Sequence, residues 1–110
     1  MERFFYQNNI SGFLADSEDT ILGILARNNS FDLVDLQRNA WLYEITFLKK
    51  LLHNESAGEI IFEYSIPRLG KRIDVVLLLH GIVFVLEFKV GADKYSRQDW
   101  EQVWDYALDL

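Results

Sequence analysis

"RIDVVLLLHGIVFVLEFKV", residues 72–90, decides the fold that this sequence predicts. Two apolar runs flank the dipeptide His80-Gly81, which is typical of the two-residue loop of a β-hairpin. Asp74, Glu87 and Lys89 interrupt these runs, although a charged group is costly to bury. The stretch therefore predicts a hairpin whose charged side chains need an explanation.

The sequence before the hairpin predicts a third strand and two helices. The run EIIFEYSI (59–66) predicts a strand, and the turn PRLG joins it to the hairpin. A long amphipathic helix is predicted from about residue 32 to 53. Ser17 resembles the N-cap of a shorter helix. We therefore expect an N-terminal helical extension at residues 1–31 and an α+β domain at residues 32–110.

The residues after the hairpin predict one more helix. Ser96 and Asp99 resemble a capping box, and Trp100, Val103, Trp104, Ala107 and Leu108 form an apolar stripe at helical spacing. The pattern contains no stop signal up to Leu110. We expect the chain to end before its fold does, as a fragment of a longer protein.

Composition limits the class of protein. The chain has 110 residues, half of them hydrophobic, which favours one globular domain. It has no cysteine, which excludes disulfides and thiolate zinc sites. It shows no secretory signal and no apolar run long enough to span a bilayer, so we expect a cytoplasmic protein without a membrane partner.

Charge is unevenly distributed along the chain. The net charge is -6, yet residues 68–97 contain six Lys or Arg and only three Asp or Glu. Such a basic window is compatible with a site that faces phosphates, and equally with ordinary surface charges.

The hairpin register predicts a cluster of carboxylates. A two-residue loop places Asp74 opposite Glu87, and a four-residue PRLG loop places Glu63 opposite Asp74, with Lys89 further along the same face. Opposed like charges about 5 Å apart are unfavourable, and a divalent cation such as Mg²⁺ or Mn²⁺ would remove the conflict. The alternative is a structural ion pair between Glu87 and Lys89 or Arg72.

Asp74, followed by Glu87-Phe88-Lys89 on the next strand, resembles the PD-(D/E)XK signature of restriction-endonuclease-like nucleases. Ile73 stands where the name-giving proline would be. The resemblance covers residues 32–110 and implies a long helix, a three-stranded antiparallel meander and a helix, truncated before the next strand. It implies that Asp74, Glu87 and the Phe88 carbonyl hold Mg²⁺ or Mn²⁺, and that Lys89 is catalytic.

Two further features carry the resemblance. Gln102 and Tyr106, four residues apart, are similar to the extra motif of the RecB-like branch, which implies that they position the site and the nucleic acid. Glu44 lies on the apolar face of the long helix and matches the acidic metal ligand that the family often takes from this helix. The alternatives are an ordinary surface Gln and Tyr, and a Glu44 that pairs with an arginine or reaches solvent.

The segments RNAWLYEI, FEYSIPRLGKRIDVVLL and FVLEFKVG also resemble the N-terminal region of bacterial proteins that carry a Schlafen-type helicase-like ATPase domain. The resemblance implies a metal-dependent nuclease coupled to that ATPase, with DNA favoured over RNA. Arg68, Lys71 and Arg72 would meet the phosphate backbone. The alternatives are a catalytically inactive module used for docking and a fragment that forms a homodimer.

Overall fold

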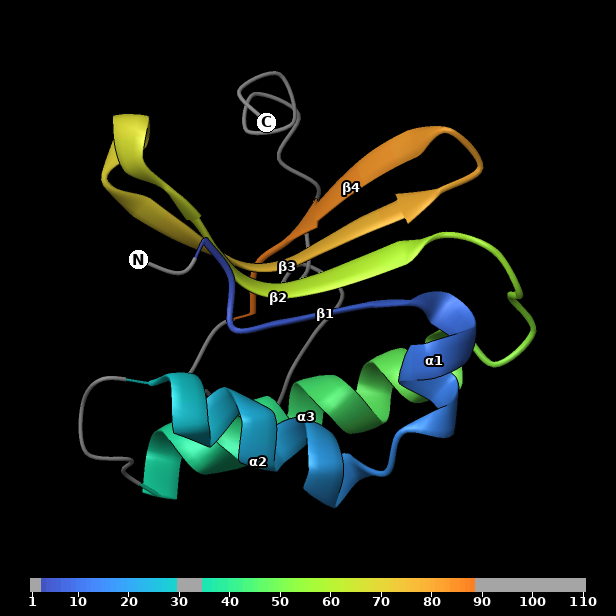
Figure 1. Ribbon diagram of the computed structural model, residues 1–110, viewed down its shortest axis with the longest axis horizontal. Coiled ribbons are helices and arrows are strands. Elements are labelled where there is room, and N and C mark those ends of the chain that lie inside the picture. The colour runs from blue at the N-terminus through green and yellow to red at the C-terminus, as the bar shows by residue number, and fades with distance from the viewer. Residues whose placement is uncertain (1–2, 30–34, 89–110) are drawn as a thin grey trace.

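The computed structural model describes residues 3–29 and 35–88 (Figure 1). The elements are, in chain order, β1 (Tyr6–Asn9), α1 (Ile10–Ala15), α2 (Glu18–Asn28), α3 (Asp35–Leu51), β2 (Glu59–Ile66), the 3₁₀ turn η1 (Pro67–Leu69), β3 (Lys71–Leu79) and β4 (Ile82–Leu86). The described part of the chain therefore has mixed α and β structure, as the sequence predicted.

The strands form one antiparallel sheet in the order β1-β2-β3-β4, and the three described helices lie on one face of it (Figure 1). The predicted meander is confirmed, and β2 and β3 have the bounds that their apolar runs indicated. β4 ends at Leu86, however, so Glu87 and Phe88, which were expected on this strand, lie just beyond it. The sheet has a fourth strand, β1, which the sequence reading missed. β1 is only four residues long, YQNN, and offers too few apolar positions for an alternating pattern.

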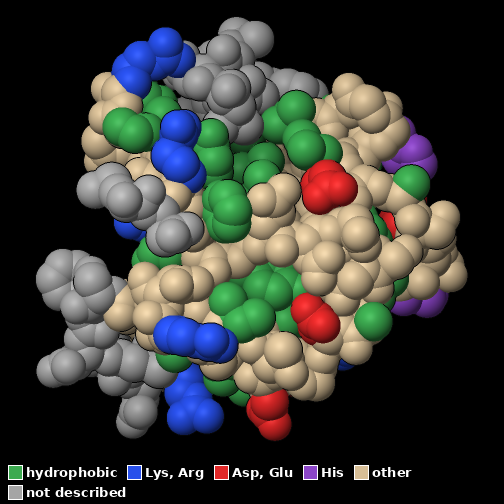
Figure 2. Space-filling view, viewed as in Figure 1, with side chains coloured by type: hydrophobic (Ala, Val, Ile, Leu, Met, Phe, Trp, Pro, Cys, Tyr) green, Lys and Arg blue, Asp and Glu red, His purple; other side chains and the backbone are tan. Residues whose placement is uncertain are grey.

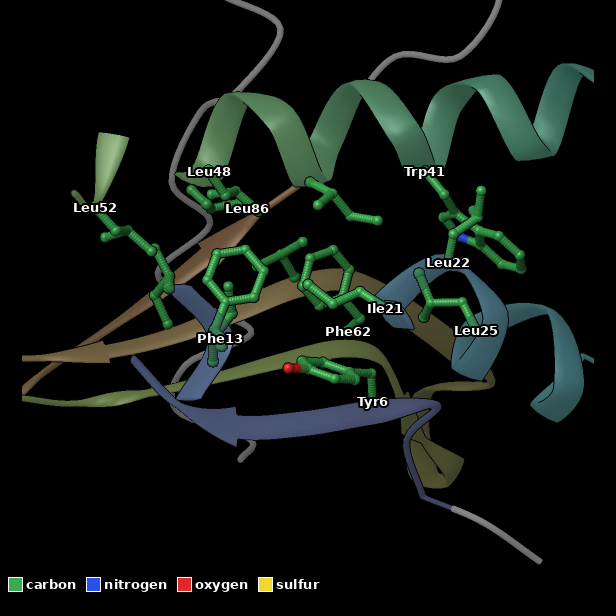
Figure 3. Close-up of a cluster of buried hydrophobic side chains, with 14 of the residues drawn as sticks. Tyr6, Phe13, Ile21, Leu22, Leu25, Trp41, Leu48, Leu52, Phe62 and Leu86 are labelled. Atoms are coloured by element: carbon green, nitrogen blue, oxygen red, sulfur yellow. The ribbon is translucent and has the colours of Figure 1, made fainter. Parts of the chain in front are cut away.

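The N-terminal segment shares its core with the rest of the molecule (Figure 3). Tyr6, Ile10, Phe13, Ile21 and Leu25 are at most 4% exposed and belong to the same cluster as the buried side chains of α3 and the sheet. The described residues of the predicted helical extension thus form a strand and two helices that pack against the sheet and α3.

Local sequence sets the element ends. The Ser17 hydroxyl accepts a hydrogen bond from the Thr20 N–H at 3.1 Å, so the predicted N-cap of α2 is confirmed. His80 and Gly81 both have positive φ, 53° and 76°, as the two central residues of a type I′ hairpin turn require. This turn fixes the β3–β4 register.

The second face of the sheet is also apolar. Ile66, Ile73, Val76 and Val85 form a smaller buried cluster there. Both faces of β3 around Asp74 are thus apolar, as the sequence indicated. Within residues 3–29 and 35–88, no helix has the length and apolar character that crossing a bilayer requires.

Candidate functional site

The strand register brings three carboxylates to one level of the sheet. The β3–β4 pairs run from Leu79↔Ile82 to Val75↔Leu86, so that Asp74 comes next beside Glu87. The β2–β3 pairs on either side of this level place Glu63 opposite Asp74. The predicted register is confirmed for both pairs of strands.

The side chains of β2 change face at Glu63. Phe62 belongs to the main core, whereas Tyr64 packs against the cluster on the second face of the sheet. Residues two apart in a regular strand share a face, so the strand is irregular between them. Glu63 has φ 58°, a conformation that costs a non-glycine residue about 1–3 kcal/mol and that concentrates at functional sites.

β3 changes face at the same level. Ile73 lies in the second cluster and Val75 in the main core, with Asp74 between them. The two opposed strands are therefore irregular at the two opposed carboxylates. This local departure from the pleat leaves both carboxylates in a position that regular strands would not give them.

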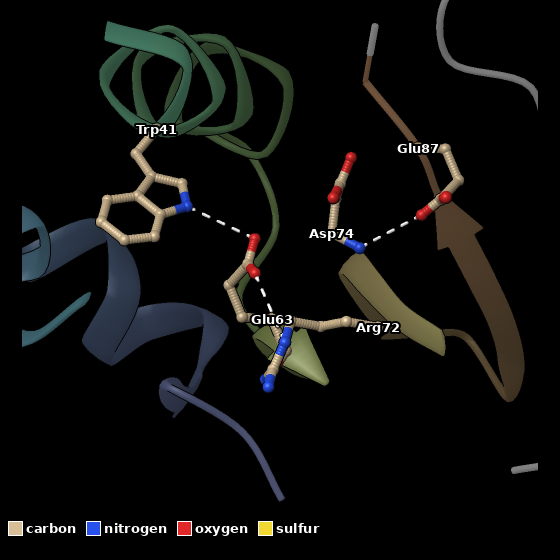
Figure 4. Close-up of polar contacts among 5 residues, drawn as sticks. All are labelled: Trp41, Glu63, Arg72, Asp74 and Glu87. Carbon is tan, nitrogen blue, oxygen red and sulfur yellow. Dashed lines mark hydrogen bonds and ion pairs between the residues drawn. The ribbon is translucent and has the colours of Figure 1, made fainter. Parts of the chain in front are cut away.

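Backbone N–H groups at this level donate to carboxylates. The Asp74 N–H donates to Glu87 Oε2 at 3.2 Å (Figure 4). The Phe88 N–H donates to Asp74 Oδ2 at 2.8 Å. The two side chains therefore link β3 to the end of β4 where the described ladder stops. Phe88 is itself 7% exposed and packs against the main core.

Glu63 is held from two sides. The Trp41 indole N–H, from α3, donates to Glu63 Oε2 at 3.3 Å. Arg72, from β3, places its Nε 4.0 Å from Glu63 Oε1 and donates from a terminal nitrogen to the Glu63 carbonyl at 3.1 Å. Figure 4 shows the Glu63 carboxylate turned toward Trp41 and the Asp74 carboxylate directed toward α3. Glu63 therefore bridges the helical layer and the sheet.

Glu44 is the one buried charged side chain in the described part of the chain. It is 2% exposed, and its Oε1 has no hydrogen-bond partner among the described residues. Burial raises the pKa of Glu44 well above its ordinary value, and the nearby Asp74, Glu63 and Glu87 carboxylates raise it further. Glu44 therefore belongs electrostatically to the same cluster.

The other carboxyls show the same cost of burial. Burial and the Asp74 charge raise the pKa of Glu63 to about 7, although the Trp41 hydrogen bond and Arg72 lower it in part. Burial and Glu87 raise the pKa of Asp74 to about 6, against the hydrogen bond from the Phe88 N–H. The cluster thus carries more negative charge than its environment stabilises.

The donor set is oxygen-rich, which suits Mg²⁺ or Mn²⁺. The unpartnered Oε1 of Glu44 beside three further carboxyls fits such an ion. Across the two described ranges, however, no three acidic or histidine side chains lie in an arrangement that coordinates a cation as they stand. Glu87 and Asp74 bind backbone N–H groups instead, and Glu63 binds Trp41. Cation binding therefore requires side-chain rotation.

The remaining predicted residues fall into two groups. Arg68 lies in η1, and Lys71 and Arg72 are exposed at the start of β3, so all three belong to the turn that joins β2 to β3. Lys89, Gln102 and Tyr106 lie outside the described residues.

Trp41, on α3, is a site residue that the sequence did not indicate, because an apolar side chain on this helix is expected in the core. It is a core residue, 1% exposed, and also the hydrogen-bond donor to Glu63. A buried indole N–H needs an acceptor, and that need was the available signal.

Comparison of the chain with protein-family models, curated proteins and solved structures found no match.

Proposed function

We propose that this chain is the nuclease part of a metal-dependent enzyme that hydrolyses phosphodiester bonds in nucleic acid. The observation that carries the proposal is Glu44, a buried glutamate within electrostatic reach of three more carboxyls, one of whose oxygens has no hydrogen-bond partner among residues 3–29 and 35–88. A purely structural carboxyl in such a place would be expected to have a hydrogen-bond partner. The PD-(D/E)XK-like order of Asp74, Glu87 and Lys89 in the sequence supports the same assignment.

Under this proposal Asp74, Glu87 and the Phe88 carbonyl hold the cation, and Glu44 contributes directly or through water. Mg²⁺ or Mn²⁺, when bound there, lowers the pKa of a coordinated water and offsets charge that develops on the phosphate. Asp74 and Glu87 give up their backbone N–H donors when they turn to the ion. Glu63 is a further acidic candidate.

The remaining residues orient the reactants. Lys89 follows the Glu87-Phe88 dipeptide, and its ammonium would stabilise negative charge on the phosphate in the transition state. Gln102 and Tyr106 would position the site and the nucleic acid.

The β2–β3 turn is the proposed contact with the nucleic-acid backbone. Arg68, Lys71 and Arg72 would bind phosphates there. Figure 2 shows Lys and Arg side chains at the upper left of the view, where Figure 1 places this turn, and others lower down, over the helices. We propose DNA over RNA as substrate, a helicase-like ATPase domain in the full-length bacterial protein, and a cytoplasmic location.

The test is cleavage by the full-length protein of single- and double-stranded DNA and RNA with Mg²⁺ or Mn²⁺. Asp74→Asn and Lys89→Ala are expected to lower the rate about a hundredfold or more while the protein stays folded. Glu59→Gln removes the carboxylate of the first residue of β2, away from Asp74, and is the matched control. Absence of cleavage by the unmodified protein with either metal on any substrate would contradict the proposal.

The second candidate is a catalytically inactive module of the same fold that docks a partner or forms a homodimer. It is favoured by the hydrogen bonds that Asp74 and Glu87 make to backbone N–H groups, which give both carboxylates a structural role. For such a module, Asp74→Asn would lower thermal stability and leave no nuclease activity to lose.

A further inference from the structure

Arg72 has one side against the protein and the other in solvent. Its guanidinium carbon lies 4.6 Å from the centroid of the Phe5 ring, and one terminal nitrogen donates to the Glu63 carbonyl. Its side chain is nevertheless 41% exposed. The Phe5 ring and the Glu63 backbone thus hold the guanidinium at the surface, where an anion from solvent can reach it.

Of the contacts that Arg72 makes, the ion pair with the Glu63 carboxylate is the weak one. The two charged groups are 4.0 Å apart, the outer limit of an ion pair, and solvent around the Arg72 side chain weakens their attraction. The Glu63 side chain, in contrast, is 13% exposed and stays in contact with the buried Trp41. Arg72 can therefore exchange its charged partner while Trp41 keeps the Glu63 carboxylate in place.

When Arg72 binds another anion, the Glu63 carboxylate is left with excess negative charge around it. Among the described residues, Asp74 and Glu87 are charged groups that act on its carboxylate, and both disfavour its ionised form. A divalent cation is the ligand that such a group attracts most strongly. A phosphate diester, in turn, is a bidentate acceptor that matches the arginine fork.

We propose that Arg72 and Glu63 couple the two ligands of the site: a backbone phosphate that binds Arg72 releases the Glu63 carboxylate for the cation. This inference rests on the proposed function. It assigns Arg72 and Glu63 to positioning roles and makes nucleic acid and metal ion bind cooperatively. Because coupling between two binding sites is reciprocal, the cation must also tighten nucleic-acid binding by the same factor.

The experiment measures Mn²⁺ binding to the full chain from the electron paramagnetic resonance signal of the free ion. Titrations are run without nucleic acid, with a phosphorothioate DNA oligonucleotide that resists hydrolysis, and with an uncharged methylphosphonate oligonucleotide of the same sequence. The phosphorothioate is expected to tighten Mn²⁺ binding about tenfold, within the usual range of such coupling, and the methylphosphonate to leave it unchanged.

Arg72→Gln is the decisive variant. Without DNA, this variant is expected to bind Mn²⁺ more tightly than the unmodified chain, because Glu63 no longer has the Arg72 guanidinium beside it. DNA is expected to change the Mn²⁺ affinity of the variant by less than about twofold. Glu63→Gln is expected to lose the DNA effect as well. Lys50→Gln removes an exposed positive charge from α3, outside the proposed site, and is expected to retain the DNA effect. If Arg72→Gln fails to fold, Arg72→Lys keeps the charge without the fork and is expected to show reduced coupling.

The outcomes separate this inference from the proposed function. The coupling between Arg72 and Glu63 is overturned, and the nuclease assignment stands, if the protein cleaves and binds Mn²⁺ with a DNA effect that survives Arg72→Gln. The same holds if Lys50→Gln abolishes the DNA effect equally. Absence of both Mn²⁺ binding and cleavage overturns the two together.

Discussion

Glu44 shows how a single residue can oppose the stability of the fold. Its place on the apolar face of α3 would suit a leucine or methionine. Instead, a carboxyl oxygen is buried there that has no hydrogen-bond partner among the described residues. Residues that cost stability without a packing role are expected where function requires them. The side chain is therefore informative because it is unfavourable.

Glu44→Gln is expected to stabilise the metal-free protein at pH 8 by about 1–2 kcal/mol, because the variant has no carboxyl that must stay protonated or carry a buried charge. At pH 5 the two proteins are expected to differ little. Chemical denaturation at both pH values in the presence of a chelator measures the difference. A variant that is less stable at pH 8 would show that the Glu44 carboxylate has a favourable structural partner.

Asp74 and Glu63 predict how stability varies with pH. Their folded pKa values, about 6 and about 7, lie above the ordinary values of 3.8 and 4.5. Above pH 4 the unfolded chain therefore binds fewer protons at these groups than the folded protein. The stabilisation they give is fully present below the ordinary values and is lost as pH rises through the folded values.

The metal-free protein is thus expected to lose on the order of 5 kcal/mol of stability from these two groups between about pH 4 and pH 7. Melting curves in chelator measure the loss, and the double variant Asp74→Asn, Glu63→Gln should flatten the curve. Under the proposed function, saturating Mg²⁺ should also reduce it, because the ion binds the ionised carboxylates. A slope that the double variant leaves unchanged would assign the pH dependence to other groups.

At the scale of elements, α1 depends on α3 for its C-terminal end. The Lys49 ammonium, from α3, donates to the carbonyls of Phe13, Leu14 and Asp16 at 2.6, 3.3 and 2.5 Å. Three carbonyls at or just after the end of a six-residue helix thereby gain a charged donor. This contact fixes the position of α1 relative to the helix that carries Glu44.

Lys49→Met is expected to destabilise the protein by about 1.5–3 kcal/mol, the usual worth of hydrogen bonds to a charged group. Lys50→Met is the matched control, because Lys50 is the exposed neighbour, and it should change stability by less than about 0.5 kcal/mol. Denaturant unfolding of both variants gives the comparison. Equal effects of the two substitutions would show that the Lys49 contacts contribute nothing beyond the loss of a positive charge.

At the scale of the whole molecule, the described residues before position 30 are part of the folded unit. Tyr6, Phe13 and Ile21 are buried in the main cluster, and β1 extends the sheet beside β2. Removal of these elements would expose the core side chains that they cover, such as Phe62 and Trp41.

A fragment that starts at residue 32 is therefore expected to be unfolded or aggregated. The expected result is loss of the cooperative melting transition in circular dichroism, because the fragment lacks a large part of the main core. The 110-residue chain is the control. A fragment with cooperative melting and a dispersed NMR spectrum would show that residues 32–110 fold alone and that the first 31 residues are an extension.

The sequence by itself determined what short-range rules control. Alternating and continuous apolar runs defined β2 and β3, Ser17 marked the start of α2, and the two-residue turn at His80 set the register that aligns Asp74 with Glu87. These features depend on residues close together in the chain, so that each pattern contains its own physical cause.

Only the tertiary structure decided the rest. β1 is stabilised by a partner more than fifty residues away, which no local pattern encodes. The left-handed backbone of Glu63 and its contact with Trp41 arise where α3 meets the sheet. The same holds for the Glu44 oxygen that has no partner in the described part of the chain. Burial, and with it the raised pKa of each carboxyl, is a property of the packed layers, because it depends on which side chains exclude water from a given atom.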